Sequence, residues 1–156
     1  EPVLLGSAGT LVANKAFVAN ETSFFIFYGD NLTNTSLSNL RDFHVAQQHG
    51  FTMALFETNN PGGCGIVSLN EQCTITHFEE KPVHPVSNLA NAGLYVASPA
   101  VIEMIDSTKT PADIGFDLLP LLVNKMSGYK INDYLIDIGT HKNLEKAREE
   151  FPLLIS

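Results

Sequence analysis

Apolar residues occur along the chain either with helical spacing or in short unbroken runs. The clearest unbroken run is Phe24–Tyr28, which stops at Gly29 and Asp30. A run of aromatic and β-branched residues that ends on Gly and Asp predicts a buried strand of a parallel sheet. The same criteria predict further strands at 52–57, 64–69, 74–78, 91–97 and 131–138. The two strands on either side of Asn70 are expected to form a hairpin.

Segments with helical spacing precede and separate these strands. They predict helices over 6–19, 37–49, 99–106, 114–126 and 141–151. Ser36 and Thr140 stand where a side-chain oxygen can cap a helix, and Gly50 is the expected stop of the second helix. The order of elements is typical of an α/β layered sheet, mostly parallel and flanked by helices, with an antiparallel hairpin insertion. Because such a sheet normally has a strand before its first helix, we expect an N-terminal piece to be missing.

Composition places limits on the class of protein. The chain has 156 residues, enough for one domain over 1–156, and no apolar stretch reaches the roughly 18 residues of a membrane span. Its net charge of −8 argues against a nucleic-acid surface but allows nucleotides as small ligands. Cys64 and Cys73 flank the hairpin turn without facing each other, so we expect no disulfide and a reducing, cytoplasmic compartment. No membrane partner is expected.

Two aspartates stand near the ends of apolar runs that lie far apart in the sequence. Asp30 follows the first strand, and Asp137 lies in the run 134–138. In an open α/β sheet, ligands bind outside the carboxyl ends of the strands. Two carboxylates from distant segments suit a Mg²⁺ ion that gathers phosphates. For Asp30 the alternative is a turn residue, since turns favour both Gly and Asp.

Other motifs each allow a functional and an ordinary interpretation. The segment 5–9 opens a helix with small residues, which lets a base or phosphate approach the helix end, or else makes Ser7 an ordinary N-cap. Glu80 and Lys81 end a strand, where they can meet sugar hydroxyls and a phosphate, or form a solvated hairpin end. Gly65 and Asn91 can bring a close-approach glycine and an amide to a ligand, or belong to a bulge and a plain strand.

The order of these motifs is more specific than any one of them. The blocks LGSAG, YGDN, GCGIV, FEEKP, NAGLY and DIGTHKNLEKA together resemble the sugar-1-phosphate nucleotidyltransferases, or NDP-sugar pyrophosphorylases. The resemblance is closest to mannose-1-phosphate guanylyltransferase-like and glucose-1-phosphate thymidylyltransferase-like members, and it extends from Glu1 to about Phe151. It implies a Rossmann-like, nucleotide-diphospho-sugar transferase-like fold. It also implies a Mg²⁺-dependent enzyme that makes an NDP-sugar, a polysaccharide precursor, and pyrophosphate from an NTP and a hexose or heptose 1-phosphate.

The resemblance also implies roles for single residues. It assigns catalysis to Asp30, Lys81 and Asp137, and metal binding to Asp30 and Asp137. It assigns nucleotide binding to Leu5, Gly6, Ser7 and Ala8, and sugar binding to Gly65, Glu80 and Asn91. Lys81 would meet the sugar phosphate. Ser7 stands where the family usually has threonine, which keeps the hydroxyl.

One departure from the family pattern is large. Nothing in the sequence matches the family's first strand, its glycine-rich triphosphate loop or the Pro-Lys-Pro stretch that follows. We therefore expect residues 1–156 to be a nucleotidyltransferase domain without its N-terminal strand and loop, inactive alone but active as the full-length protein. The alternative is a non-catalytic sugar-phosphate or nucleotide-binding subunit or sensor. A Rossmann dehydrogenase would need G-x-G-x-x-G after a first strand, which is absent. A homo-oligomer is compatible with the sequence.

Overall fold

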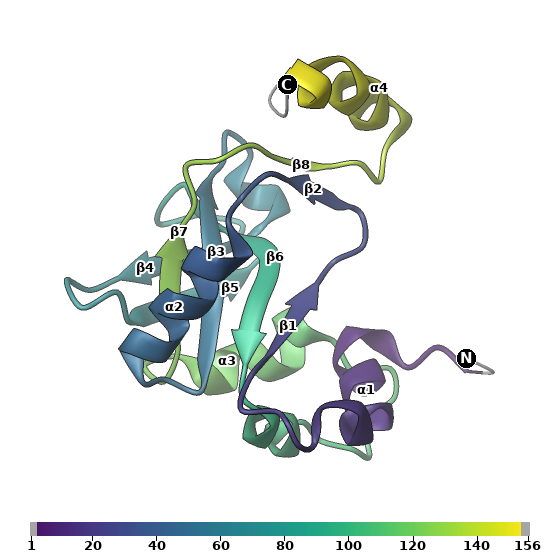
Figure 1. Cartoon of the computed structure of the whole chain (residues 1–156), viewed down its shortest axis with the longest axis vertical. Coiled ribbons are helices and arrows are strands. Elements are labelled where there is room, and N and C mark those ends of the chain that lie inside the picture. The colour runs from purple at the N-terminus through teal and green to yellow at the C-terminus, as the bar shows by residue number, and fades with distance from the viewer. Residues whose placement is uncertain (1–2, 154–156) are drawn as a thin grey trace.

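The computed structural model describes residues 3–153, which form one main sheet, a two-stranded ribbon and the helices around them (Figure 1). In the main sheet the strand order is β5-β4-β6-β3-β7, and β1 also pairs with β6; the ribbon consists of β2 and β8. The strands are β1 (Phe24–Phe27), β2 (Asn31–Thr33), β3 (Phe51–Glu57), β4 (Gly65–Leu69), β5 (Ile75–Glu80), β6 (Leu89–Ala97), β7 (Ser127–Lys130) and β8 (Leu135–Asp137). The α-helices are α1 (Gly6–Ala13), α2 (Leu37–Gln47), α3 (Leu119–Leu122) and α4 (His141–Glu150).

The α/β class with helices on both sides of the sheet is confirmed. Strand β6 is antiparallel to β1, β3 and β4, so these three run in one direction, and β7 is parallel to β3. Most strands of the main sheet, namely β1, β3, β4 and β7, thus run in the same direction, as expected. Because β6 lies between the others, however, β3–β7 is the parallel pair within the described residues, and the other pairs are antiparallel. The antiparallel hairpin β4–β5 is confirmed.

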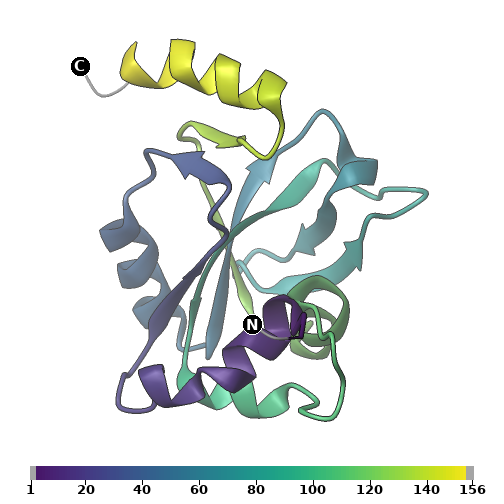
Figure 2. The same ribbon diagram turned by 90° about the vertical axis from the view of Figure 1, so that its right-hand side faces the viewer.

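The core lies on both faces of this sheet. Alternate residues of β6 point to opposite faces, so Tyr95 and Ala97 belong to one apolar cluster and Leu94 and Val96 to the other. Helices α1 and α3 cover the first face and α2 the second, where Leu40 is fully buried (Figure 2). Helix α4 lies beyond the ribbon, at the end of the molecule away from α1 (Figure 1).

Strand β6 changes its partner along one edge. Its residues Leu94–Ala97 pair with β1, and Ala90 pairs with Ile66 of β4. Between these two stretches β1 has ended and β4 has not begun. On the opposite edge, the pairing with β3 slips at the same place, because Met53 faces Tyr95 while Leu55 faces Asn91. The extra residues of β6 form a bulge in which Gly93 has a φ of +65°, a backbone conformation that glycine adopts without strain.

Helices start where the sequence predicts and end earlier. Ser36 and Thr140 cap α2 and α4 by accepting hydrogen bonds from backbone N–H groups. Helix α2 ends at Gln47, and its C-cap is Gln48, which is left-handed with a φ of 58°, so Gly50 is not the stop. The first predicted helix ends at Ala13 and continues as a 3₁₀ helix over Lys15–Val18; another 3₁₀ helix replaces the one predicted over 99–106. The helix predicted over 114–126 is a π-helical turn followed by the short α3.

Two predictions for strands are wrong. The run 131–138 is not one strand: β7 ends at Lys130, the chain turns, and β8 begins at Leu135 in the ribbon. Strand β1 is not buried in a parallel sheet, because Phe25 and Phe27 are 41% and 47% exposed on one face and the strand pairs antiparallel with β6. Because apolar residues stand on both faces of this strand, its alternation of inward and outward positions cannot be recognised in the sequence.

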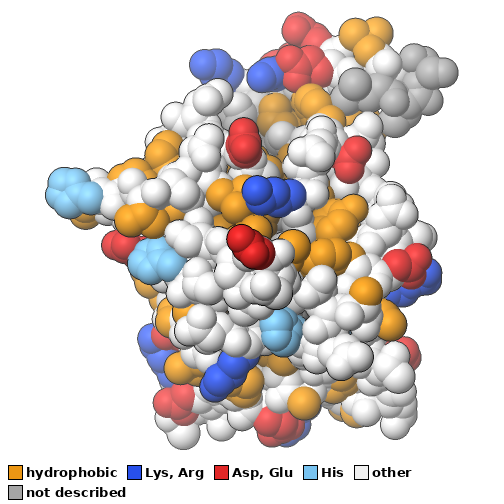
Figure 3. Space-filling model, turned by 90° about the vertical axis from the view of Figure 1, so that its left-hand side faces the viewer, with side chains coloured by type: hydrophobic (Ala, Val, Ile, Leu, Met, Phe, Trp, Pro, Cys, Tyr) orange, Lys and Arg blue, Asp and Glu red, His pale blue; other side chains and the backbone are white. Residues whose placement is uncertain are grey.

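Figure 3 presents one face of the surface. Acidic, basic and apolar side chains are interspersed there, and the basic ones form no continuous stripe (Figure 3). Within residues 3–153, no helix combines the length and the apolar character needed to cross a membrane.

The buried His44 should make stability depend on pH. Its Nδ1 lies 2.9 Å from Thr52 Oγ1, and burial lowers the pKa of the imidazole below its usual value. As the pH falls through about 6.5, the unfolded chain therefore takes up a proton at this site before the folded chain does. The free energy of unfolding should therefore decrease as the pH is lowered through that range, and this decrease should be less steep in His44→Gln. Urea denaturation at several pH values measures this, with His84→Gln on an exposed loop as the matched control; equal slopes for His44→Gln and wild type would contradict it.

Candidate functional site

The gap between β1 and β4 along β6 opens into a hollow of about 380 Å³. Its floor is the bulge of β6, and its walls come from segments on both sides of the gap. It is lined by Tyr28, Asn31, Phe56, Gly63, Cys64, Gly65, Glu80, Lys81, Asn91, Ala92, Gly93, Asp113, Gly115, Phe116, Leu135 and Asp137. A second hollow lined by Ser7, Gly29, Asp30 and other residues adjoins it, since Tyr28 and Asp113 line both.

Glu80 lies in a slot between two glycines. A Cβ atom at Gly65 would lie 2.6 Å from Glu80 Oε2, and one at Gly115 would lie 2.8 Å from the same oxygen. The carboxylate therefore occupies space that any larger residue at either position would take. Burial raises the pKa of Glu80; Lys81 acts in the opposite direction and Asp113 raises it further. A half-buried carboxylate in a hollow of this kind can accept hydrogen bonds from hydroxyl groups.

Lys81 follows Glu80 at the end of β5. Its φ of 50° is left-handed, and its backbone N–H donates to the Cys64 carbonyl at 3.0 Å. This turn directs the chain out of the sheet at the rim of the hollow. Within the described residues, the Lys81 ammonium forms no ion pair. It is exposed, and is therefore available to a phosphate of a ligand in the hollow.

The ribbon brings Asp30 and Asp137 together, although more than a hundred residues separate them. Asn31 pairs with Asp137, and the Ile138 N–H donates to the Asp30 carbonyl at 2.7 Å. A Cβ atom at Gly139 would lie 2.9 Å from Asp137 Oδ1 and 3.5 Å from Asp30 Oδ2. Both carboxylates thus face the same small space beside Gly139. Asp137 Oδ1 also accepts a hydrogen bond from the Gly139 N–H at 2.7 Å. A cation shared by the two carboxylates stays a prediction.

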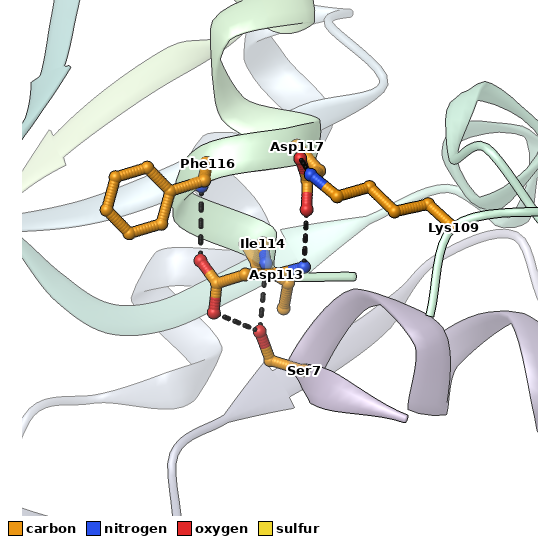
Figure 4. Close-up of polar contacts among 6 residues, drawn as sticks. All are labelled: Ser7, Lys109, Asp113, Ile114, Phe116 and Asp117. Atoms are coloured by element: carbon orange, nitrogen blue, oxygen red, sulfur yellow. Dashed lines mark hydrogen bonds and ion pairs between the residues drawn. The ribbon is translucent and has the colours of Figure 1, made fainter. Parts of the chain in front are cut away.

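The segment Leu5–Ala8 contacts residues 112–114 instead of standing free. The Ala8 N–H donates to the Ala112 carbonyl at 3.0 Å, so this carbonyl satisfies part of the N-terminus of α1. Ser7 is not an N-cap. Its hydroxyl donates to Asp113 Oδ2 at 2.9 Å and accepts from the Ile114 N–H at 2.8 Å (Figure 4).

Asn91 holds the bulge. Its Oδ1 accepts from the Gly93 N–H at 2.9 Å, and its Nδ2 donates to the Tyr95 hydroxyl at 2.7 Å. Asn31 supports the same turn, because its Nδ2 donates to the Ala92 carbonyl at 2.8 Å. Asn91 therefore shapes the floor of the hollow and also lines it.

The structure brings most of the predicted site residues together. Gly65, Glu80, Lys81, Asn91 and Asp137 line the first hollow, and Ser7 and Asp30 line the second. Leu5 and the fully buried Ala8 line neither of these two hollows, and Gly6 packs against the Ala112 backbone. Whether each residue binds a ligand stays a prediction.

Sequence reasoning missed Tyr28, Asp113 and Gly115. Asp113 did carry a signal, because it precedes the predicted helix 114–126 as an N-cap would. Its Oδ1 accepts from the Phe116 N–H at 3.1 Å (Figure 4). Gly115 carried none, since only the folded chain places it against Glu80.

Comparisons with known proteins agree on one family. A family model described as "Nucleotidyl transferase" matches residues 1–152. Glucose-1-phosphate adenylyltransferase from Bacillus cytotoxicus is 31% identical over 91% of the chain, and the one from Bacillus thuringiensis (strain Al Hakam) is 29% identical. The chain spans 41% of the length of each of these relatives.

Solved structures show the same fold. A putative glucose-1-phosphate thymidylyltransferase from Bacillus anthracis, in complex with sucrose, superimposes with a TM-score of 0.77 at 22% identity, over 91% of this chain and 59% of that one. HddC from Yersinia pseudotuberculosis gives a TM-score of 0.79 at 20% identity, over 97% and 64% of the two chains.

The contacts of Ser7 predict a specific loss of stability. Ser7→Ala would leave the Ile114 N–H and one oxygen of Asp113 without their partner, which should lower the free energy of unfolding by about 1–2 kcal/mol. Ser7→Thr keeps the hydroxyl and should lose much less. Chemical denaturation of the three proteins checks this; equal stabilities for Ser7→Ala and wild type would show that the bond to Asp113 contributes nothing.

Proposed function

The chain belongs to the nucleotidyl transferase family, and we propose that the full-length protein is a Mg²⁺-dependent sugar-1-phosphate nucleotidyltransferase. It makes an NDP-sugar and pyrophosphate from an NTP and a hexose or heptose 1-phosphate. The observation that carries the proposal is the single hollow that gathers Glu80, Lys81, Asn91 and Asp137 at the break between β1 and β4, with Asp30 beside it.

The reaction needs positioning more than it needs chemical groups. A phosphate oxygen of the sugar 1-phosphate forms a bond to the α-phosphorus of the NTP. The bond between the α-phosphorus and the oxygen that bridges it to the β-phosphorus breaks, and pyrophosphate leaves with the electron pair. No enzyme nucleophile is required, and catalysis consists of alignment and charge neutralisation.

Each site residue has a part in that alignment. Glu80, fixed between Gly65 and Gly115, accepts hydrogen bonds from sugar hydroxyls. Lys81 places its ammonium against the sugar phosphate, where it offsets the charge of the attacking group. Asn91 keeps the bulged floor of the hollow in shape through Gly93 and Tyr95.

The two aspartates fit a Mg²⁺ ion. Their oxygens face one small space that a Cβ at Gly139 would fill, and both side chains are exposed. Within residues 3–153 no group of three or more His, Cys, Asp or Glu side chains could hold a metal ion. Two carboxylates are nevertheless sufficient, because Mg²⁺ is commonly held by one or two carboxylates together with water and substrate phosphates. When bound, the ion neutralises charge on the phosphates.

The nucleobase and the sugar are found by a direct screen. The full-length protein is incubated with Mg²⁺ and each of the four NTPs, combined with several hexose and heptose 1-phosphates, and released pyrophosphate is measured. We expect turnover with at least one pair. Binding of these ligands without turnover would support the alternative of a non-catalytic subunit or sensor. A result that shows no binding and no turnover with any pair would overturn the proposal.

The shared cation predicts that Asp30 and Asp137 act as a unit. In the full-length enzyme, Asp30→Asn and Asp137→Asn should each lower kcat on the order of 100-fold, and the double variant should lose little more. Both variants should need more Mg²⁺ for half-maximal rate, and a chelator should abolish wild-type activity. Asp42→Asn, on the exposed face of α2, is the matched control. A double variant whose losses multiply would contradict a single shared ion.

The role of Lys81 predicts an effect on one substrate. Lys81→Ala should raise the KM for the sugar 1-phosphate roughly 30- to 150-fold, because a charge-assisted contact of about 2–3 kcal/mol is removed, and should change the KM for the NTP far less. Lys142→Ala, on the exposed surface of α4, should match wild type. An unchanged KM for the sugar 1-phosphate in Lys81→Ala would instead support the interpretation of Lys81 as part of a solvated strand end.

A further inference from the structure

Gly115 is a buried residue of the π-helical turn Ile114–Leu118, and it lies against the Glu80 carboxylate. A Cβ atom at this position would be 2.8 Å from Glu80 Oε2 and 3.1 Å from Asp113 Oδ1. The first of these distances is too short for a real Cβ atom. A side chain at Gly115 would therefore force either the turn or the Glu80 carboxylate to move.

Hydrogen bonds hold the backbone on both sides of Gly115 in place (Figure 4). The Ile114 N–H donates to Ser7 Oγ at 2.8 Å, and the Phe116 N–H donates to Asp113 Oδ1 at 3.1 Å. A shift of the turn would break both bonds and leave a donor unpaired in each case, which costs free energy. The turn is therefore the part that resists movement.

Glu80 is the part that can move, because its carboxylate is the far end of a flexible side chain at the end of β5. Gly65 closes the other side of its slot, since a Cβ atom there would be 2.6 Å from the same oxygen, Glu80 Oε2. That atom would also be 2.8 Å from the ring of the buried Phe78. A side chain at Gly65 would thus disturb the core as well, whereas one at Gly115 would push the Glu80 carboxylate out of its slot.

We propose that Gly115 is a positioning residue for the sugar side of the site, because the absence of a side chain there determines where the Glu80 carboxylate lies. This proposal rests on the proposed function, in which Glu80 accepts hydrogen bonds from the hydroxyl groups of the sugar 1-phosphate. Such bonds weaken steeply with poor distance or angle. Gly115 therefore acts on the sugar through Glu80, and a displaced carboxylate binds the same sugar less tightly.

Gly115→Ala tests this role in the full-length enzyme. The KM for the sugar 1-phosphate should rise roughly 10- to 100-fold, because hydrogen bonds to a charged group are lost, and the KM for the NTP should change far less. Alanine can adopt this backbone, since the φ of Gly115 is not left-handed, so the thermal unfolding midpoint should stay close to that of wild type. Gly62→Ala is the matched control: its Cβ would be 3.7 Å from the Pro82 carbonyl oxygen, an ordinary contact, and both KM values should be unchanged.

The Glu80→Ala background separates positioning from a structural role. Without the carboxylate the new Cβ has room, so adding Gly115→Ala to Glu80→Ala should change the KM for the sugar 1-phosphate less than about twofold. An equal rise in both backgrounds would overturn the role of Gly115 while the proposed function stands. The same conclusion would follow from an unchanged KM in Gly115→Ala alone, or from a lower unfolding midpoint with both KM values raised. A wild-type enzyme inactive with every substrate pair would overturn both proposals.

Discussion

The arrangement of this molecule depends on a change of partner along one edge of β6. A strand in the middle of a sheet must have its backbone groups paired, so an edge can be left open only where something else satisfies them. Here the bulge at Ala92–Leu94 turns the backbone, Asn91 and Asn31 take up the Gly93 N–H and the Ala92 carbonyl, and Tyr28 covers the break. The hollow exists because these side chains, and not a strand, complete the edge.

The same constraint explains why carboxylates with different exposure occur in one site. Glu80 is half-buried between Gly65 and Gly115, where burial raises its pKa and its environment suits neutral hydroxyl groups. Asp30 and Asp137 lie on the ribbon outside the main sheet and are exposed, so keeping their charge costs little desolvation. The exposed ribbon therefore suits the proposed cation, and Glu80 suits the hydroxyl groups of the proposed sugar.

Much of the fold could be predicted, because caps and the alternation of apolar residues are local. Ser36 and Thr140 marked two helix starts, and the hairpin 64–78 was visible from its turn. The resemblance named Glu80 and Lys81, and Asp30 with Asp137, residues that the structure does bring together. Pairing could not be predicted, because nothing local shows that 89–97 lies between 24–27 and 51–57. The prediction of one strand over 131–138 failed for the same reason: β7 ends at Lys130 against β3, and β8 begins at Leu135 against β2.

The residues that were missed share one property, which is that their importance lies in contacts made across the fold. Gly115 is significant only because Glu80 lies against it, and Tyr28 only because its ring packs against Gly93 and Tyr95. Such residues are generic in a sequence: one is a glycine in a turn and the other the last aromatic residue of an apolar run. A site formed at a break in a sheet will contain many of them, since both ends of the break must be closed by side chains from elsewhere. In the proposed function, the motif residues supply the chemistry and these generic residues position them.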